Sequence, residues 1–135
     1  MKFRTLTCIA AITLFAALAI QVRVAAQEQQ QGNAERPQHY TVTDLGTLGG
    51  TFSDSAGIDN RHRIVGASTV ASGQQHAYIF SKAKMTDLNE LIPADSGWTL
   101  VAATGINGVG EIVGNGRING QTHAFLLTPD DDDED

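Results

Sequence analysis

Two histidines occupy matching positions in two nearly identical phrases of the sequence. His76 stands in GQQHAYIF and His123 stands in GQTHAFLL. Imidazole is a common metal ligand, so recurring histidines raise the question of a metal site. No third ligand is spaced near either histidine in the sequence, and matching positions of a repeat lie apart in space. We therefore expect no metal and no cofactor. Both histidines are predicted to be structural, with ring nitrogens hydrogen-bonded to the backbone or to Gln74 and Gln121.

Two aspartates recur in the same manner. Asp44 and Asp87 each stand in a Thr-Asp-Leu phrase and could be read as an acid pair for proton transfer. One aspartate per repeat instead favours a hydrogen bond in a turn or a strand ladder. The sequence contains no GxSxG nucleophile elbow, and no acid is spaced to orient a histidine base. We predict no catalytic residues, and so a protein that is not an enzyme.

The single tryptophan, Trp98, stands in a loop that is inserted in the second copy of the repeat. An exposed indole can stack on a sugar ring, which makes Trp98 a weak candidate for ligand contact. Capping of the hydrophobic core is the interpretation that we favour for this residue.

Self-similarity dominates the region from residue 40 to residue 129. Three phrases recur in the same order with a period in the forties, a spacing typical of propeller blades or helical pairs. The matched phrases are VTDLGTL and MTDLNEL, then GIDNRHRIVG and GINGVGEIVG, then HAYIF and HAFLL.

Short runs rich in β-branched and aromatic residues, separated by Gly, Asn and Asp, favour strands over helices. We therefore predict an all-β fold of two four-stranded antiparallel blades, over residues 40–84 and 85–129, as in a propeller. The expected strands are YTVTDL, SAGI, RIVGAS and HAYIF, followed by MTDL, TLVAATGI, EIVGN and HAFLL.

The strand faces predict that each sheet is covered on both sides. His76, Tyr78 and Phe80 should share one face, and Ala77 and Ile79 the other, so both faces are largely apolar. The same alternation holds for the second phrase. We expect small residues to let neighbouring sheets approach closely, namely Ala77, Ala124, Gly66 and Gly114.

The repeated phrases resemble those of the HAF-repeat extracellular proteins, bacterial exported proteins named for a His-Ala-Phe triplet. The triplet appears as His76-Ala77-Tyr78 and as His123-Ala124-Phe125. The resemblance covers about two-thirds of the chain and implies a blade-like fold, but it brings no established activity. The first copy departs from the pattern at His62, where the turn is expected to have a glycine; the second copy has Gly110 there.

The two ends of the chain carry signals of their own. Residues 1–26 have a basic start, an apolar run and a final Val-Ala-Ala, which predict a secretory signal peptide cleaved after Ala26. The single cysteine, Cys8, lies within it, so the exported chain should have no disulfide. Residues 27–39 are Gln-rich and predicted to be a disordered linker, and residues 130–135 form an acidic tail.

Charge and repeat number bound the partners. The chain has 15 acidic and 9 basic residues, which disfavours binding to nucleic acid or anionic lipid. After cleavage we expect no membrane span and a secreted or periplasmic location. Two blades would leave apolar sheet faces exposed, so we predict self-association, with a trimer favoured.

Two kinds of function remain from the sequence. One is a non-catalytic binding module for a cell-surface glycan or protein. The alternative is a structural or vestigial repeat protein, a shortened member of its family, with no ligand of its own.

Overall fold

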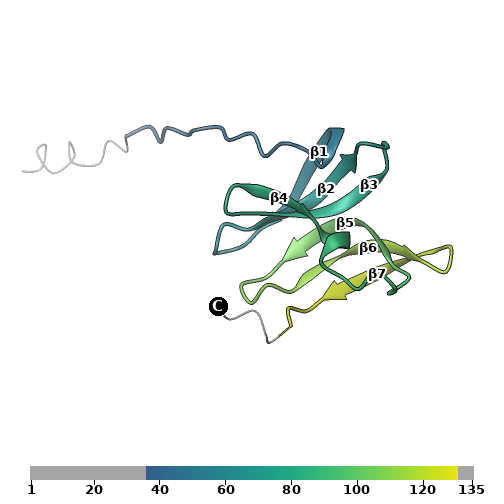
Figure 1. Cartoon of the computed structure of the whole chain (residues 1–135). Helices are drawn as coiled ribbons and strands as arrows, with labels where there is room; N and C mark the ends of the chain where they lie inside the picture. The colour runs from purple at the N-terminus through teal and green to yellow at the C-terminus, as the bar shows by residue number, and fades with distance from the viewer. Residues whose placement is uncertain (1–35, 131–135) are drawn as a thin grey trace, which may run out of the picture. The chain divides into compact units, whose positions relative to one another are not determined.

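The strands of the described residues form two antiparallel sheets (Figure 1). The computed structural model describes residues 36–130, so the predictions for residues 1–26, for most of the 27–39 linker and for most of the 130–135 tail lie outside it. The first sheet has the strand order β1-β2-β3-β4 and the second has β5-β6-β7. The elements are β1 (Gly49–Ile58), β2 (Ile64–Val70), β3 (Gln75–Ser81), β4 (Lys84–Asp87), the 3-10 helix η2 (Leu88–Glu90), β5 (Thr99–Ile106), β6 (Ile112–Ile118) and β7 (Gln121–Leu127).

The all-β prediction is confirmed, but the prediction of four strands in each sheet is wrong for the second sheet. The YTVTDL segment, residues 40–45, forms no strand in the structure. A strand needs a neighbouring strand to hydrogen-bond with its backbone N–H and C=O groups. Val42 and Thr43 are exposed, and no strand lies beside them among the described residues. The strand predicted over SAGI is longer than expected: SAGI forms only the end of β1, which begins at Gly49.

The sheets do not divide where the sequence phrases divide. The MTDL phrase opens the second copy of the repeat, yet it forms β4 and pairs with β3 of the first sheet, with Asp87 opposite Tyr78. Each copy therefore begins with the segment that completes the sheet of the copy before it. Val42–Leu45 is the corresponding segment of the first copy.

Both repeats have the same irregularity in their first strand pair. The register shifts between Ser55 and Gly57 in β1, and between Ala103 and Gly105 in β5. A β-bulge of this kind bends the strand and re-aims its carbonyl groups. The repeated phrases therefore encode a repeated backbone shape as well as a hydrophobic pattern.

Gly66 and Gly114 have a different role from the predicted one. A Cβ atom added at Gly66 would overlap the carbonyl oxygen of Asp54 in the paired strand β1, and one added at Gly114 would overlap that of Ala102 in β5. The close approach is therefore within each sheet, where the bulge turns a carbonyl onto the glycine. Between the sheets, the close approach is at Gly57, where an added Cβ would lie 3.4 Å from the Cα of Gly105.

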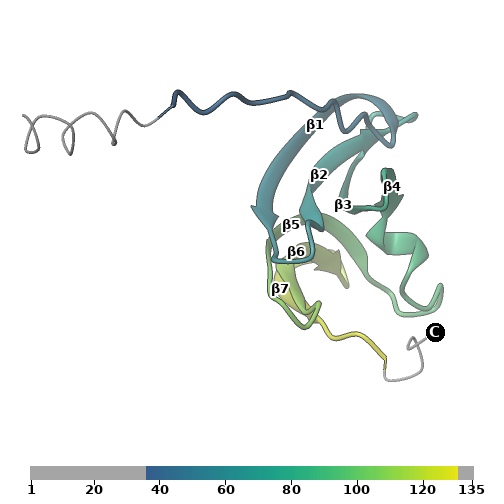
Figure 2. The same ribbon diagram turned by 90° about the vertical axis from the view of Figure 1, so that its left-hand side faces the viewer.

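The hydrophobic core lies between the sheets, and β5 carries the main contacts. β5 lies against β1, β2 and β3 of the first sheet (Figures 1 and 2). Ala77 contributes to this core as expected of a small residue at a sheet interface, whereas its counterpart Ala124 is exposed. The buried core residues are Val65, Ala77, Leu88, Leu100, Ala103, Ile112 and Phe125.

Matching turns connect the first two strands of each repeat. In the first turn the amide of His62 donates to the carbonyl of Asp59, and in the second the amide of Gly110 donates to the carbonyl of Asn107. Both donors have a positive φ, 60° at His62 and 96° at Gly110. This conformation is strained for a residue with a Cβ.

We expect His62→Gly to stabilise the protein by about 0.5–1 kcal/mol, because glycine adopts the left-handed conformation without steric cost. The side chain of His62 is exposed, so little packing is lost. Urea unfolding of the two proteins measures the difference. An unchanged or lower midpoint in the variant would contradict this reading of the turn.

The two turns differ in their ionisable groups. Asp59 accepts hydrogen bonds from the amides of Arg61 (3.0 Å) and Arg63 (2.8 Å) and from Nε of Arg63 (2.7 Å). In the second turn the side chain of Asn107 instead donates to Oε2 of Glu111, at 2.6 Å. Burial of Asp59 opposes its ionisation, but the hydrogen bonds from Arg63 and Arg61 outweigh this and hold the pKa of the carboxyl below its ordinary value of 3.8.

A carboxyl with a lowered pKa stabilises the folded state above its unfolded pKa, and that contribution is lost as the pH falls through the folded pKa. We therefore expect the free energy of unfolding to drop below pH 3.8, and Asp59→Asn to remove this part of the drop. Unfolding measured at neutral and at acid pH tests the difference, since Asn107 fills the matching position without a charge. An equal acid loss in both proteins would count against a role for Asp59.

Candidate functional site

His76 is held by a carboxylate on the neighbouring strand. Its Nδ1 lies 2.6 Å from Oδ2 of Asp87, and both side chains are partly buried. The other oxygen of Asp87 accepts a hydrogen bond from the backbone amide of Asn89, so Asp87 is also the N-cap of η2. From the sequence we predicted Gln74 or the backbone as the hydrogen-bond partner of His76, and no acid positioned to orient a histidine. The contact with Asp87 was therefore not predicted. It depends on the β3–β4 register, which the sequence does not show directly.

His123 occupies the matching position but has no such partner. Its Nε2 lies 3.2 Å from Oε1 of Gln121, a residue that the sequence had named as a partner, and its side chain is exposed. Asp44 is the counterpart of Asp87, and its Oδ1 accepts the amide of Gly46 at 2.9 Å. Both aspartates therefore accept a turn hydrogen bond from the amide two residues later, but among residues 36–130 only Asp87 contacts a histidine.

We expect His76→Ala to destabilise the fold more than His123→Ala. Removal of the His76 ring leaves Oδ2 of the partly buried Asp87 carboxylate without its hydrogen-bond partner, at a cost of about 1–3 kcal/mol. Removal of the exposed His123 should cost at most about 0.5 kcal/mol in the single chain. Urea unfolding at a low protein concentration compares the two variants. Equal losses would contradict the difference in environment.

The histidine–aspartate pair has two members of a catalytic triad and lacks the third. Among residues 36–130, no hydroxyl or thiol group hydrogen-bonds to the ring of His76. The same residues contain no group of three or more His, Cys, Asp or Glu side chains that could hold a metal ion. The geometry therefore offers the pair a structural role in joining β3, β4 and η2.

The aromatic candidates pack in the interior. Trp98 lies against the hydrophobic core and meets the ring of Phe125 edge-on, with centroids 6.4 Å apart, and that of His123 at 6.5 Å. This packing accounts for Trp98 as a cap on the core. Tyr78 is fully buried, and its burial, followed by the nearby Asp54 carboxylate, raises the pKa of the phenol above its ordinary value.

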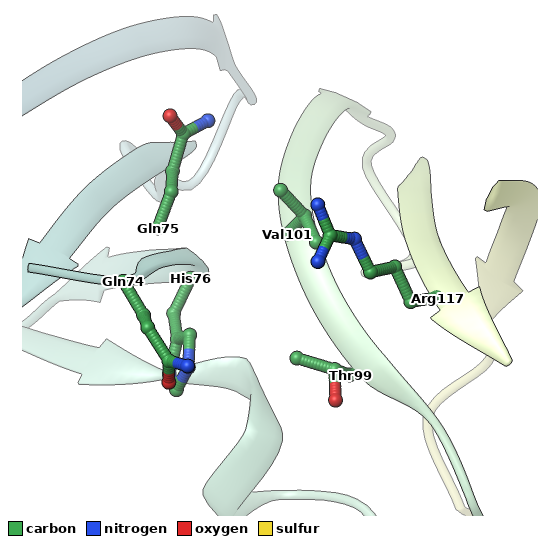
Figure 3. Close-up of a pocket in the computed structure, with 6 residues that line it drawn as sticks. All are labelled: Gln74, Gln75, His76, Thr99, Val101 and Arg117. Carbon is green, nitrogen blue, oxygen red and sulfur yellow. The ribbon is translucent and has the colours of Figure 1, made fainter. Parts of the chain in front are cut away.

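A polar cleft lies between the two sheets, at the end where β2 turns into β3. It has a volume of about 290 Å³, and Figure 3 shows its lining side chains. One wall comes from the start of β3 and the turn before it, and the other from β5 and β6. The lining residues are Gln74, Gln75, His76, Thr99, Val101 and Arg117.

The chemistry of the cleft is that of a binding site for a hydroxylated or anionic group. Two glutamine amides offer donors and acceptors, Thr99 offers a hydroxyl, and Arg117 offers five N–H donors. In Figure 3 the Arg117 side chain extends from β6 toward Val101 of β5. The sequence pointed to His76 but not to the other walls, because the lining joins residues from both repeats.

The chain matches no family model, no curated protein and no solved structure. Its likeness to the HAF-repeat proteins therefore rests on the repeated phrases themselves. No helix within residues 36–130 is long and apolar enough to span a membrane.

Proposed function

We propose that this chain is a secreted HAF-repeat protein with propeller-like blades, which acts as a non-catalytic binding module. Its ligand is a cell-surface saccharide that carries carboxylate groups, bound in the cleft between the sheets. The observation that supports this proposal is the placement of Arg117 opposite the amides of Gln74 and Gln75 across one polar cleft.

The cleft side chains complement the two groups that an acidic sugar presents. A guanidinium binds a carboxylate through two parallel hydrogen bonds, and this pairing is stronger than one between neutral groups. Side-chain amides and a threonine hydroxyl suit sugar hydroxyls, which are both donors and acceptors. The chain as a whole is acidic, with a net charge of −6, so attraction of an acidic ligand must come from this local site.

Calorimetric titration of the full chain with oligogalacturonate, and with its methyl ester as the neutral counterpart, tests the proposal. We expect binding of the acidic oligosaccharide, about tenfold or more weaker binding of the ester, and a similar loss in Arg117→Ala. Arg61→Ala is the matched control, because Arg61 is also exposed but lies outside the cleft. Absence of binding, or equal binding by the Arg117 variant, would overturn the proposal.

A structural repeat protein is the second candidate, and one observation favours it. The outer face of the second sheet exposes the large apolar side chains of Val113 and Leu126. Exposed apolar patches of this kind mark association surfaces. A protein that assembles but binds no saccharide in the titration above would favour this candidate.

A further inference from the structure

The two sheets have equivalent faces with similar apolar residues, but only the face of the first sheet is buried. In the first sheet, Val65 and Ala77 are fully buried against the second sheet. Their counterparts in the second sheet are Val113, which is 46% exposed, and Ala124, which is also exposed. An apolar face that one repeat covers is therefore open in the other.

The neighbouring residues show the same relation. Ile79 packs against the core, whereas its counterpart Leu126 is 59% exposed. Val65 lies beside Gly57, and Val113 lies beside Gly105 in the same way. Within the chain, Gly57 faces Gly105 of the second sheet. By the same relation, the surface formed by Gly105 and Val113 would accept Gly57 of another copy of the chain.

The first sheet carries the other half of this interface, also uncovered. An apolar depression of about 340 Å³ is lined by Leu45, Ser55, Ala56, Gly57, Ile58 and Ile64. In the second repeat the matching residues Leu88, Ala103 and Ile112 are buried in the core, and Ile106 packs against it. Ile58, the counterpart of Ile106, is instead 62% exposed.

A strand and a strand edge complete the set. The outer edge of β7 has no partner strand among the described residues, whereas the matching strand β3 pairs with β4. The segment Val42–Leu45 corresponds to the β4 phrase and is unpaired. Leu45 already lies at the depression of the first sheet, as Leu88 lies in the core beside the second. Val42–Asp44 thus precedes the first sheet in the same way as β4 precedes the second sheet.

We propose that a second copy of this chain docks head-to-tail on the second sheet. Its depression covers Val113 and Leu126, and its Val42–Asp44 segment adds to β7 as the missing fourth strand. By the β3–β4 register, in which Tyr78 lies opposite Asp87 and Ile79 opposite Thr86, Asp44 then lies opposite Phe125 and Thr43 opposite Leu126. The carboxylate of Asp44 reaches His123, as that of Asp87 reaches His76.

The occupant is this chain rather than another partner, because the chain carries both halves of the interface and both halves already join once within it. Such a contact uses a different surface on each partner, so copies follow one another until a ring closes. Three copies would bring six sheets together, within the roughly four to eight blades of known propellers. This assembly goes beyond saccharide binding and does not depend on it.

Cysteine cross-linking of the full chain in a Cys8→Ser background tests the docking. One preparation carries Thr43→Cys and the other Leu126→Cys, both at exposed positions, and the two are mixed before mild oxidation. Residues directly opposite on antiparallel strands have Cα atoms about 4.5–5.5 Å apart, within the roughly 4.4–6.8 Å that a disulfide spans. We expect a disulfide-linked pair that contains one chain of each kind.

Val42→Cys is the matched control for register, because its side chain points to the opposite face of the added strand. It should cross-link to Leu126→Cys at least tenfold less than Thr43→Cys does. Absence of the mixed product would overturn the proposal, as would equal cross-linking by Val42→Cys. A disulfide that forms within single chains of the Thr43→Cys, Leu126→Cys double variant, without a mixed product, would show that the chain pairs with itself and would also overturn it.

Discussion

Gly66→Ala is expected to lower the free energy of unfolding by about 3 kcal/mol or more, and Gly114→Ala by a similar amount. In each repeat the added methyl group would meet a backbone carbonyl of the paired strand, that of Asp54 or that of Ala102. A backbone carbonyl at a bulge cannot rotate away as a side chain can. The sheet must therefore shift its pairing or lose the bulge opposite the glycine.

Urea unfolding followed by far-ultraviolet circular dichroism measures both losses. Gly108→Ala is the matched control, because an added Cβ there lies 3.2 Å from the side-chain oxygen of Asn60, which is exposed and can move. We expect the control to stay within about 0.5 kcal/mol of the unmodified protein. Losses at Gly66 and Gly114 as small as the control's would contradict the described bulge geometry.

Val65→Asp is expected to prevent folding, whereas Val113→Asp is expected to leave the fold of the single chain intact. Val65 is fully buried in the core between the sheets, where an unpaired carboxylate costs several kcal/mol. Val113 has the same place in its repeat but is 46% exposed, so its carboxylate stays in water. Domains of this size have only about 5–15 kcal/mol of stability, so the first substitution removes most of it.

Circular dichroism and thermal unfolding of the two variants at low protein concentration give the comparison. Val65→Asp should show no cooperative transition, and Val113→Asp should melt within a few degrees of the unmodified protein. Loss of the transition in both variants would mean that the second sheet needs its outer face covered in order to fold.

The strands that the sequence predicted well are those with strong local signals. The TLVAATGI run forms β5 over the predicted residues, and HAYIF and HAFLL form most of β3 and β7. Alternating apolar residues and β-branched runs report local backbone preference, and these runs form strands. The prediction that each sheet is covered on both faces is wrong for the second sheet among the described residues, because Val113 and Leu126 are exposed there. The expected conformation of the turn is also found, since His62 and Gly110 both have a positive φ.

Features that depend on pairing were not predictable in the same way. The YTVTDL run has strand-like residues, but a strand forms only where a neighbouring edge accepts its hydrogen bonds, and Val42–Leu45 has none within the described chain. The bulge partners of Gly66 and Gly114 and the Asp87 contact of His76 depend on register, which local composition does not specify. The cleft is a further case, because its walls come from strands of both sheets.

Sedimentation equilibrium of the full chain beside its Val113→Asp variant is the most direct test of the idea that the repeat sheets are built to cover one another. We expect the unmodified protein to have three times the single-chain mass that is measured in denaturant. We expect the variant to have the mass of one chain. A single-chain mass for the unmodified protein at every concentration would contradict the account, as would a variant that assembles as fully as the unmodified protein.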